Sequence, residues 1–200
     1  MIWWRPAVAG WGAICASIGL ARFAYVPLFP AMVAAGWVDG GGGGLLGAAN
    51  LAGYLAGVMA GRGLARRVGV PRALDAGMAL AALSFAACAV QGGLAWFGLW
   101  RGLAGVAGGF LMALSGPSVQ ASVPAEARGL AGGMVMAGAG TGVMLAGLLV
   151  PLRLGGGLAV AWLGLSVAVL GIGLVVRRWW PDPAVVPAPG AGQGVPRALR

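Results

Sequence analysis

Six consecutive apolar stretches, each long enough to cross a bilayer, occupy nearly all of this 200-residue chain. Hydrophobic residues make up 60% of the chain and charged residues only 8%, and the mean hydropathy is +0.92. A soluble domain needs a far more charged surface, whereas a helix that crosses a hydrocarbon core of ~30 Å needs about 20 apolar residues. The chain is therefore a membrane protein.

Short connections rich in glycine or arginine separate the apolar stretches. The predicted spans are residues 7–29 (extending as far as 35), 44–64, 73–92, 94–115, 129–152 and 156–176. Period-two alternation is absent, which argues against an outer-membrane barrel, and in lipid a helix satisfies its own backbone. We predict an all-α polytopic membrane bundle of six transmembrane helices over residues 1–180. A flexible Pro/Gly-rich cytoplasmic tail or linker is predicted over residues 181–200.

The basic residues predict the orientation. All 13 are arginine, and an N-terminus inside the cell puts most of them on the cytoplasmic side and Arg153 alone outside. The cytoplasmic set is Arg5, Arg62, Arg66, Arg67, Arg72, Arg128, Arg177, Arg178, Arg197 and Arg200. We therefore expect a multi-pass protein of the cell inner (plasma) membrane with both termini cytoplasmic. The net charge of +9 then reflects loops at an anionic bilayer surface, and no nucleic-acid partner is expected.

The N-terminus has a second interpretation. Arg5 followed by apolar residues 7–20 also fits a cleaved signal peptide. The apolar run continues past Arg22 to Phe29, which favours a retained first helix.

Several chemistries are excluded by residues that the sequence lacks. There is no histidine, so a His-dependent triad or a His-ligated metal is impossible. The four acids, Asp39, Asp75, Glu126 and Asp182, all lie at segment ends or beyond, so none pairs with another inside the membrane. Cys15 and Cys88 sit in separate apolar segments and form no disulfide framework. We expect no enzyme activity, catalytic residue, metal or cofactor.

Glycine makes up 40 of the residues, and several recur every four positions. Such spacing puts small residues on one helix face and allows close backbone approach. The repeats are Gly53, Gly57 and Gly61, then Gly98 and Gly102, then Gly138 and Gly142. Static packing is one interpretation of any single pair; helices that slide or rock, as a transporter needs, are the other.

Two arginines, Arg22 and Arg101, fall inside predicted spans. A central arginine costs about 2.5–3.5 kcal/mol on insertion scales and usually faces a bundle interior or a water-filled cavity. Pro27 and Pro30 follow Arg22 and can kink that helix. Interhelical hydrogen bonds are the alternative role for polar groups at this depth. The candidate substrate-cavity residues are Arg22, Tyr25, Asn50, Tyr54 and Arg101.

Four segments carry a family resemblance. They are GLARFAYVPLFPAM at residues 19–32, AANLAGYLAG at 48–57, LWRGLAGVAGGF at 99–110 and AGAGTGVMLAGLLVP at 137–151. Together they resemble the N-terminal half of a major facilitator superfamily (MFS) transporter of the YbfB/YjiJ-like family. The resemblance implies half of a twelve-helix fold, built from two inverted three-helix repeats, with the substrate site between two halves near mid-membrane.

Two superfamily motifs are implied by this resemblance. In the loop between helices two and three, Arg67, Gly69 and Arg72 match the motif; Arg66 stands where an acid is usual, and Asp75 is the candidate to replace it. These five residues are the gating-loop candidates. In helix four, Arg101 and Gly105 match a motif linked in the superfamily to proton-coupled transport. Gly105 joins Gly53, Gly57, Gly138 and Gly142 as predicted helix-packing glycines.

The predicted function is secondary active transport of an unidentified small molecule, as all or half of an MFS-type transporter. A basic cavity without an acid favours an anionic substrate. Expected partners are the lipid bilayer and either a second six-helix half or a second copy of the chain. The alternative is a non-transporting six-helix scaffold or partner protein, or a truncated gene product.

Overall fold

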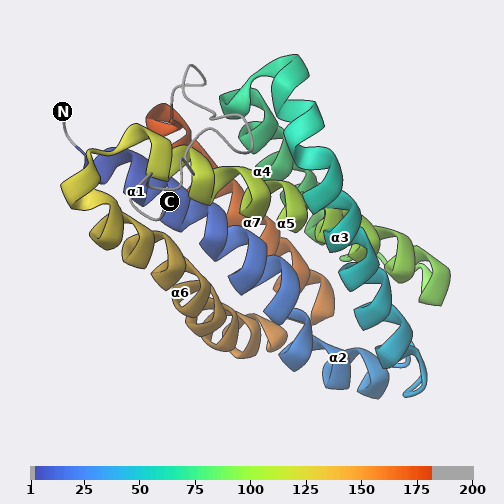
Figure 1. The fold of residues 1–200 in the computed structure, drawn as a ribbon. Helices are drawn as coiled ribbons and strands as arrows, with labels where there is room; N and C mark the ends of the chain where they lie inside the picture. The colour runs from blue at the N-terminus through green and yellow to red at the C-terminus, as the bar shows by residue number, and fades with distance from the viewer. Residues whose placement is uncertain (1–2, 182–200) are drawn as a thin grey trace, which may run out of the picture.

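The computed structural model describes residues 3–181, which form a bundle of six membrane-spanning helices with no strand among them (Figure 1). The first span is made of α1 (Trp4–Ile14), the π-helix η1 (Cys15–Arg22) and α2 (Tyr25–Ala34). The other five are α3 (Gly42–Val68), α4 (Val70–Ala87), α5 (Gly93–Ser122), α6 (Arg128–Leu154) and α7 (Leu158–Val176). Short 3-10 helices, η2 (Ala125–Ala127) and η3 (Arg177–Trp179), adjoin α6 and α7.

The predicted fold class is confirmed: the chain is an all-α helix bundle with six spans. All but the first residue of the predicted Pro/Gly-rich tail, residues 182–200, lies outside the described residues. The predicted tail therefore stays a prediction.

The structure corrects the predicted connection at residues 65–72. Helices α3 and α4 continue into it from both sides and leave only Gly69 between them. Gly69 has a φ of +88°, a conformation that glycine adopts readily, and Pro71 lies in the first turn of α4, where its missing N–H has no intrahelical acceptor. Arg66 and Arg67 occupy the last turn of α3, where the helix dipole favours positive charge.

Two further boundaries differ from the prediction. Helix α5 continues through Pro117 to Ser122, although residues 116–128 were predicted as a connection. Val119 in this extension is fully buried and packs with Ala7 and Val135, so burial favours the helix despite the proline. Helix α4 ends at Ala87 rather than residue 92, and a turn follows it before α5.

Backbone lies directly against all five predicted packing glycines, and four of them define two helix contacts. A Cβ atom at Gly53 or Gly57 of α3 would overlap a backbone carbonyl of α5. A Cβ atom at Gly138 or Gly142 of α6 would overlap a carbonyl of α1 or η1. Only glycine permits such close approach, so these positions fix how α3 packs on α5 and α6 on the first span.

These two helix pairs are related by the order of the spans. In an inverted repeat, span one corresponds to span four, span two to span five and span three to span six. The contact between spans two and four then corresponds to the contact between spans five and one. The first contact is α3 with α5, and the second is α6 with α1 and η1. Figure 1 shows α6 running beside α1 at one side of the bundle and α3 crossing α5 at the other. An inverted three-helix repeat requires this pairing.

Large apolar side chains lie both in the core and on the surface of the bundle, as is typical of a membrane protein. Trp162, Phe85 and Phe97 are among the largest fully buried side chains. Large apolar side chains also face outward: Met59 of α3 is 84% exposed and Met144 of α6 is 75% exposed. Exposed apolar surface of this extent suits contact with lipid or another protein rather than water.

Candidate functional site

Arg101 of α5 is the only buried charged side chain in the described part of the chain, with 2% of its surface exposed. Its Nη1 atom donates a hydrogen bond of 2.9 Å to the backbone carbonyl of Ala21. Its guanidinium carbon lies 4.7 Å from the centroid of the Tyr25 ring. Within residues 3–181 no carboxylate forms an ion pair with it. A carbonyl dipole and an aromatic face therefore hold this charge where an acid would be expected.

These two contacts lie on either side of a break in the first span. The π-helix ends at Arg22, and α2 begins at Tyr25. Pro27 follows and has no N–H to offer the Phe23 carbonyl. Arg101 therefore bridges the break, because it binds Ala21 before it and Tyr25 after it. π-Helical turns occur frequently at functional sites.

Asn50 of α3 lies next to the backbone of Arg101. Its Nδ2 atom donates a hydrogen bond of 2.9 Å to the Arg101 carbonyl, and its side chain is 5% exposed. Gly105 makes this approach possible, because a Cβ atom there would overlap the Asn50 carbonyl and lie 2.8 Å from the Tyr54 nitrogen. The structure thus brings together Asn50, Arg101 and Gly105, which come from two different motifs of the sequence.

Arg22 has a different environment from Arg101. It is exposed on the surface of the bundle, and it lies near the middle of a first span that runs from Trp4 to Ala34. Its guanidinium carbon lies 5.8 Å from the centroid of the Tyr54 ring of α3. The chain therefore offers one accessible arginine at mid-span, placed beside an aromatic ring, and one buried arginine behind the break.

An apolar pocket of about 290 Å³ opens beside the break, between α2 and α6. Its lining residues are Phe23, Val26, Pro27, Val143, Ala146 and Gly147. Phe23 follows Arg22 directly, so charged and apolar surface adjoin along the first span.

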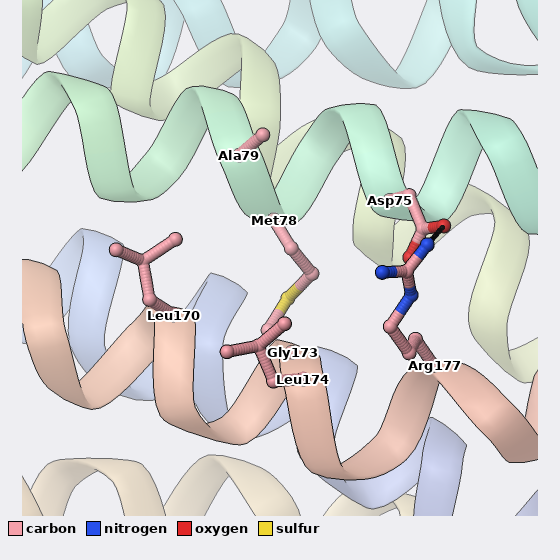
Figure 2. Close-up of a pocket in the computed structure, with 7 residues that line it drawn as sticks. All are labelled: Asp75, Met78, Ala79, Leu170, Gly173, Leu174 and Arg177. Atoms are coloured by element: carbon pink, nitrogen blue, oxygen red, sulfur yellow. Dashed lines mark hydrogen bonds and ion pairs between the residues drawn. The ribbon is translucent and has the colours of Figure 1, made fainter.

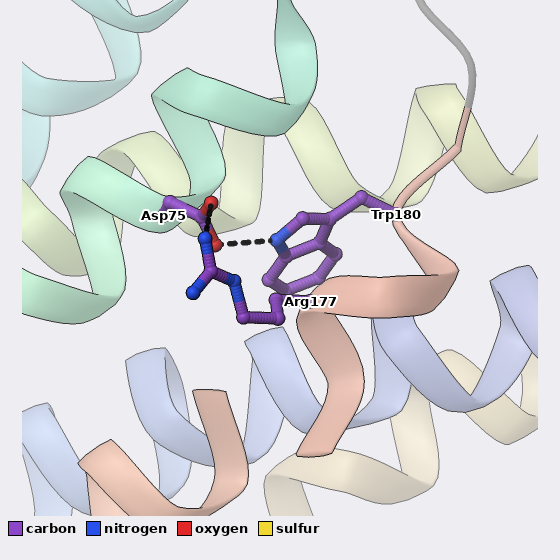
Figure 3. Close-up of polar contacts among 3 residues, drawn as sticks. All are labelled: Asp75, Arg177 and Trp180. Atoms are coloured by element: carbon purple, nitrogen blue, oxygen red, sulfur yellow. Dashed lines mark hydrogen bonds and ion pairs between the residues drawn. The ribbon is translucent and has the colours of Figure 1, made fainter. Parts of the chain in front are cut away.

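Asp75 of α4 contacts the end of the sixth span rather than the predicted gating-loop arginines. It accepts a hydrogen bond of 2.8 Å from Trp180 Nε1 and pairs with Arg177 at 3.4 Å (Figure 3). Arg66, Arg67 and Arg72 are exposed, and in the described residues none forms an ion pair with Asp75. The structure does not bring the gating-loop candidates together as one charged cluster.

Asp75 and Arg177 also stand at the charged end of a groove of about 210 Å³ between α4 and α7. Figure 2 shows its apolar lining, which extends from them along both helices: Met78, Ala79, Leu170, Gly173 and Leu174. The two polar side chains bind each other, so the groove carries little free charge.

Sequence reasoning missed the π-helix and the Ala21 carbonyl that it presents to Arg101. It also missed Thr141 of α6, whose hydroxyl oxygen accepts a hydrogen bond of 3.3 Å from Trp11 Nε1 of α1. The proline after Arg22 was the available signal for the break. Thr141 lies inside the glycine-rich segment 138–142 and is its only side chain that can accept such a bond.

Comparison with known proteins identifies the family. A search among curated proteins finds no match. A family profile described as uncharacterised MFS-type transporter YbfB matches residues 14–197, which runs from within the first span to beyond the sixth. The match covers nearly the whole chain and includes Arg22, Asn50, Arg101 and Gly105. The chain therefore belongs to this family of major facilitator superfamily transporters.

Proposed function

We propose that this chain moves an unidentified small molecule across the inner membrane by secondary active transport, as all or half of an MFS-type transporter. One observation carries the proposal: Arg22 is exposed at mid-span and has no carboxylate partner among residues 3–181. A charge facing hydrocarbon at this depth costs about 2.5–3.5 kcal/mol or more. The face that carries Arg22 is therefore suited to a water-filled cavity or a protein surface, and poorly suited to lipid.

The proposed substrate is an organic anion. Arg22 offers a planar guanidinium that can bind a carboxylate through two parallel hydrogen bonds. Tyr54 supports it from α3, and the apolar pocket that begins at Phe23 can take the uncharged part of the same molecule. In the described part of the chain the acids lie at or near span ends, as Asp75 and Glu126 do, or between spans, as Asp39 does, so none lies at mid-span to compete for the arginine. This arrangement favours an anion over a cation.

Arg101 is proposed as a positioning residue. It is too buried to meet a substrate directly, but it holds both ends of the break next to Arg22. Its Nε atom and the Tyr25 hydroxyl have no hydrogen-bond partner within the described residues. Both groups are therefore available to form a hydrogen bond if the break opens or closes during transport.

The proposed assembly covers the Arg22 face with a second six-helix half or a second copy of the chain. In this fold the substrate site lies between two halves, so one bundle supplies only part of it. We propose that both termini face the cytoplasm, in line with the arginine asymmetry. A strictly monomeric preparation of this chain that catalyses saturable uptake into liposomes would contradict the need for a second half.

The first experiment identifies the class of substrate. Purified chain is heated with matched panels of carboxylates and alkylammonium ions at equal ionic strength, and the most stabilising compound is then tested for uptake by the complete assembly in liposomes. We expect stabilisation by a carboxylate and not by the ammonium panel. Stabilisation by cations alone would refute the anion assignment.

The second experiment tests Arg22. Arg22→Gln should abolish the carboxylate-dependent stabilisation and the uptake while leaving the protein folded, and Arg22→Lys should restore them only in part because it cannot form the paired contact. Arg128→Gln is the matched control, since it removes an exposed arginine at the first residue of α6, far from mid-span. Unchanged uptake per folded Arg22→Gln molecule would rule Arg22 out of the site.

A further inference from the structure

The first and last spans end together at one face of the bundle. Trp4 at the start of α1 and Trp179 in η3 meet edge to face, with ring centroids 5.6 Å apart. Figure 1 shows the start of α1 beside the end of α7, although these segments lie at opposite ends of the sequence. Trp4 is 42% exposed. Tryptophan at span ends is typical of the boundary between hydrocarbon and headgroups.

Two arginines flank this pair of rings. The guanidinium carbon of Arg5 lies 5.8 Å from the Trp4 ring centroid, and that of Arg178 lies 4.9 Å from the Trp179 ring centroid. Both arginines are exposed. The Nε atom of Arg178 donates to the Val175 carbonyl at 3.0 Å, which leaves its terminal N–H groups free to bind another group.

The neighbouring charges leave this cluster positive. Arg177 is also exposed, but its charge is partly met by Asp75 at 3.4 Å. In the stretch that the structure describes, neither Arg5 nor Arg178 pairs with a carboxylate. Two guanidinium groups, each placed over an indole ring, therefore lie at the membrane boundary with no carboxylate paired to them among residues 3–181.

We propose that Arg5, Arg178 and the Trp4–Trp179 pair bind the phosphate of an anionic phospholipid in the leaflet on the side of the termini. Arginine matches phosphate through paired hydrogen bonds, and the adjoining indoles sit where the headgroup meets the acyl chains. The next turn of α7 presents exposed apolar side chains, Leu174 and Val175, which an acyl chain can cover. A lipid thus satisfies both the charged and the apolar parts of the cluster, which free phosphate does not.

The test compares lipids that differ only in headgroup. Purified chain in detergent is heated with phosphatidylglycerol or phosphatidylcholine of identical acyl chains, and inorganic phosphate is a third arm. We expect phosphatidylglycerol to stabilise the chain more than phosphatidylcholine does, and phosphate to have no effect at equal concentration. Stabilisation by phosphate alone would overturn the lipid assignment in favour of a free anion.

Variants locate the site. Each basic side chain near an anionic surface contributes about fivefold in affinity, so Arg5→Gln/Arg178→Gln should weaken phosphatidylglycerol binding about 25-fold. Arg62→Gln/Arg66→Gln is the matched control, because it removes the same charge from exposed arginines of α3 and should retain the binding. Equal loss in both double variants would mean general attraction to the membrane and would refute a defined site.

A measurement on the unaltered chain tests the proposal even if the variants fail to fold. Native mass spectrometry of protein released from mixed micelles should detect more retained phosphatidylglycerol than phosphatidylcholine. Equal retention of the two lipids would contradict the proposal without reliance on any substitution.

Discussion

Replacing Gly53 by alanine should separate α3 from α5. The new Cβ atom would overlap the Gly102 carbonyl oxygen and lie 2.8 Å from its carbonyl carbon, whereas carbon atoms normally pack ~3.5–4.0 Å apart. The obstructing atoms belong to the backbone, so no side-chain rotation can relieve the overlap. One helix must move away from the other, and the hydrogen bond between Asn50 and the Arg101 carbonyl lies in the same interface.

A matched control gives the size of the effect. Gly98 lies on α5, where a Cβ atom would meet only Leu46 Cδ2 at 3.9 Å, an ordinary contact. Both changes gain up to ~1 kcal/mol of helix propensity, so that term cancels between them. Overpacking costs about 1–3 kcal/mol, which means that Gly53→Ala should unfold with an equilibrium constant ~5- to 150-fold larger than that of Gly98→Ala.

The assay is equilibrium unfolding in mixed micelles with increasing sodium dodecyl sulfate, followed by tryptophan fluorescence. We expect Gly98→Ala to unfold at or above the wild-type midpoint and Gly53→Ala clearly below it. Gly102→Ala serves as a second control, because its Cβ atom would lie 3.6 Å from the Ala49 carbonyl oxygen. Equal midpoints for Gly53→Ala and Gly98→Ala would show that the close contact between α3 and α5 does not stabilise the bundle.

Three other predictions concern the topology, the charged pair and the buried arginine. Reporter fusions should read cytoplasmic at Arg67, Glu126 and Trp180 and external at Gly42 and Gly155; an external signal at Trp180 would refute the proposed orientation. Asp75→Asn should lower the unfolding free energy by less than ~1 kcal/mol, because the side chains of the pair are 57% and 38% exposed; a larger loss in detergent would contradict this. Arg101→Met should change stability little, since lost contacts and the relief of a buried charge oppose each other, but amide hydrogen exchange at residues 21–25 should become faster. Unchanged exchange there would rule out the bridging role.

The number of spans and the fold class could be predicted because they depend on the length of apolar runs, which the sequence displays directly. Helix ends were harder. At Gly69 a single residue with positive φ replaces the expected loop, and at Pro117 burial of Val119 carries the helix through a residue that usually ends one. Both outcomes depend on contacts with other helices, which no local pattern encodes.

The candidate site could be predicted only in part. The cost of Arg22 and Arg101 in lipid singled them out, and the structure places Tyr25, Asn50 and Tyr54 around them. The sequence could not distinguish the exposed arginine from the buried one. Arg101 is buried where it binds the main-chain carbonyl of residue 21. Because any residue at position 21 would supply the same carbonyl, the residue type there gives no sign of this contact.

The π-helix could not be predicted from its residues. Cys15–Arg22 contains no proline, and the segment would also read as an ordinary apolar helix. Its conformation accompanies the backbone contact of Gly19 with Gly142 and the hydrogen bond from Arg101 to Ala21. Both contacts are made with distant parts of the chain.

The π-helix also sets the direction in which the second part of the first span points. A π turn accommodates one more residue than an α turn, and an α-helix rotates by about 100° per residue. Side chains after Arg22 are therefore rotated by about 100° from their azimuth in an uninterrupted α-helix. The loss of one codon within residues 15–22 would allow an ordinary α-helix and keep Tyr25 near its present azimuth, whereas a return to α-helix without loss of a residue would turn Tyr25 away from Arg101. The gain of one codon there is accordingly a simple evolutionary route by which such a helix could acquire its break.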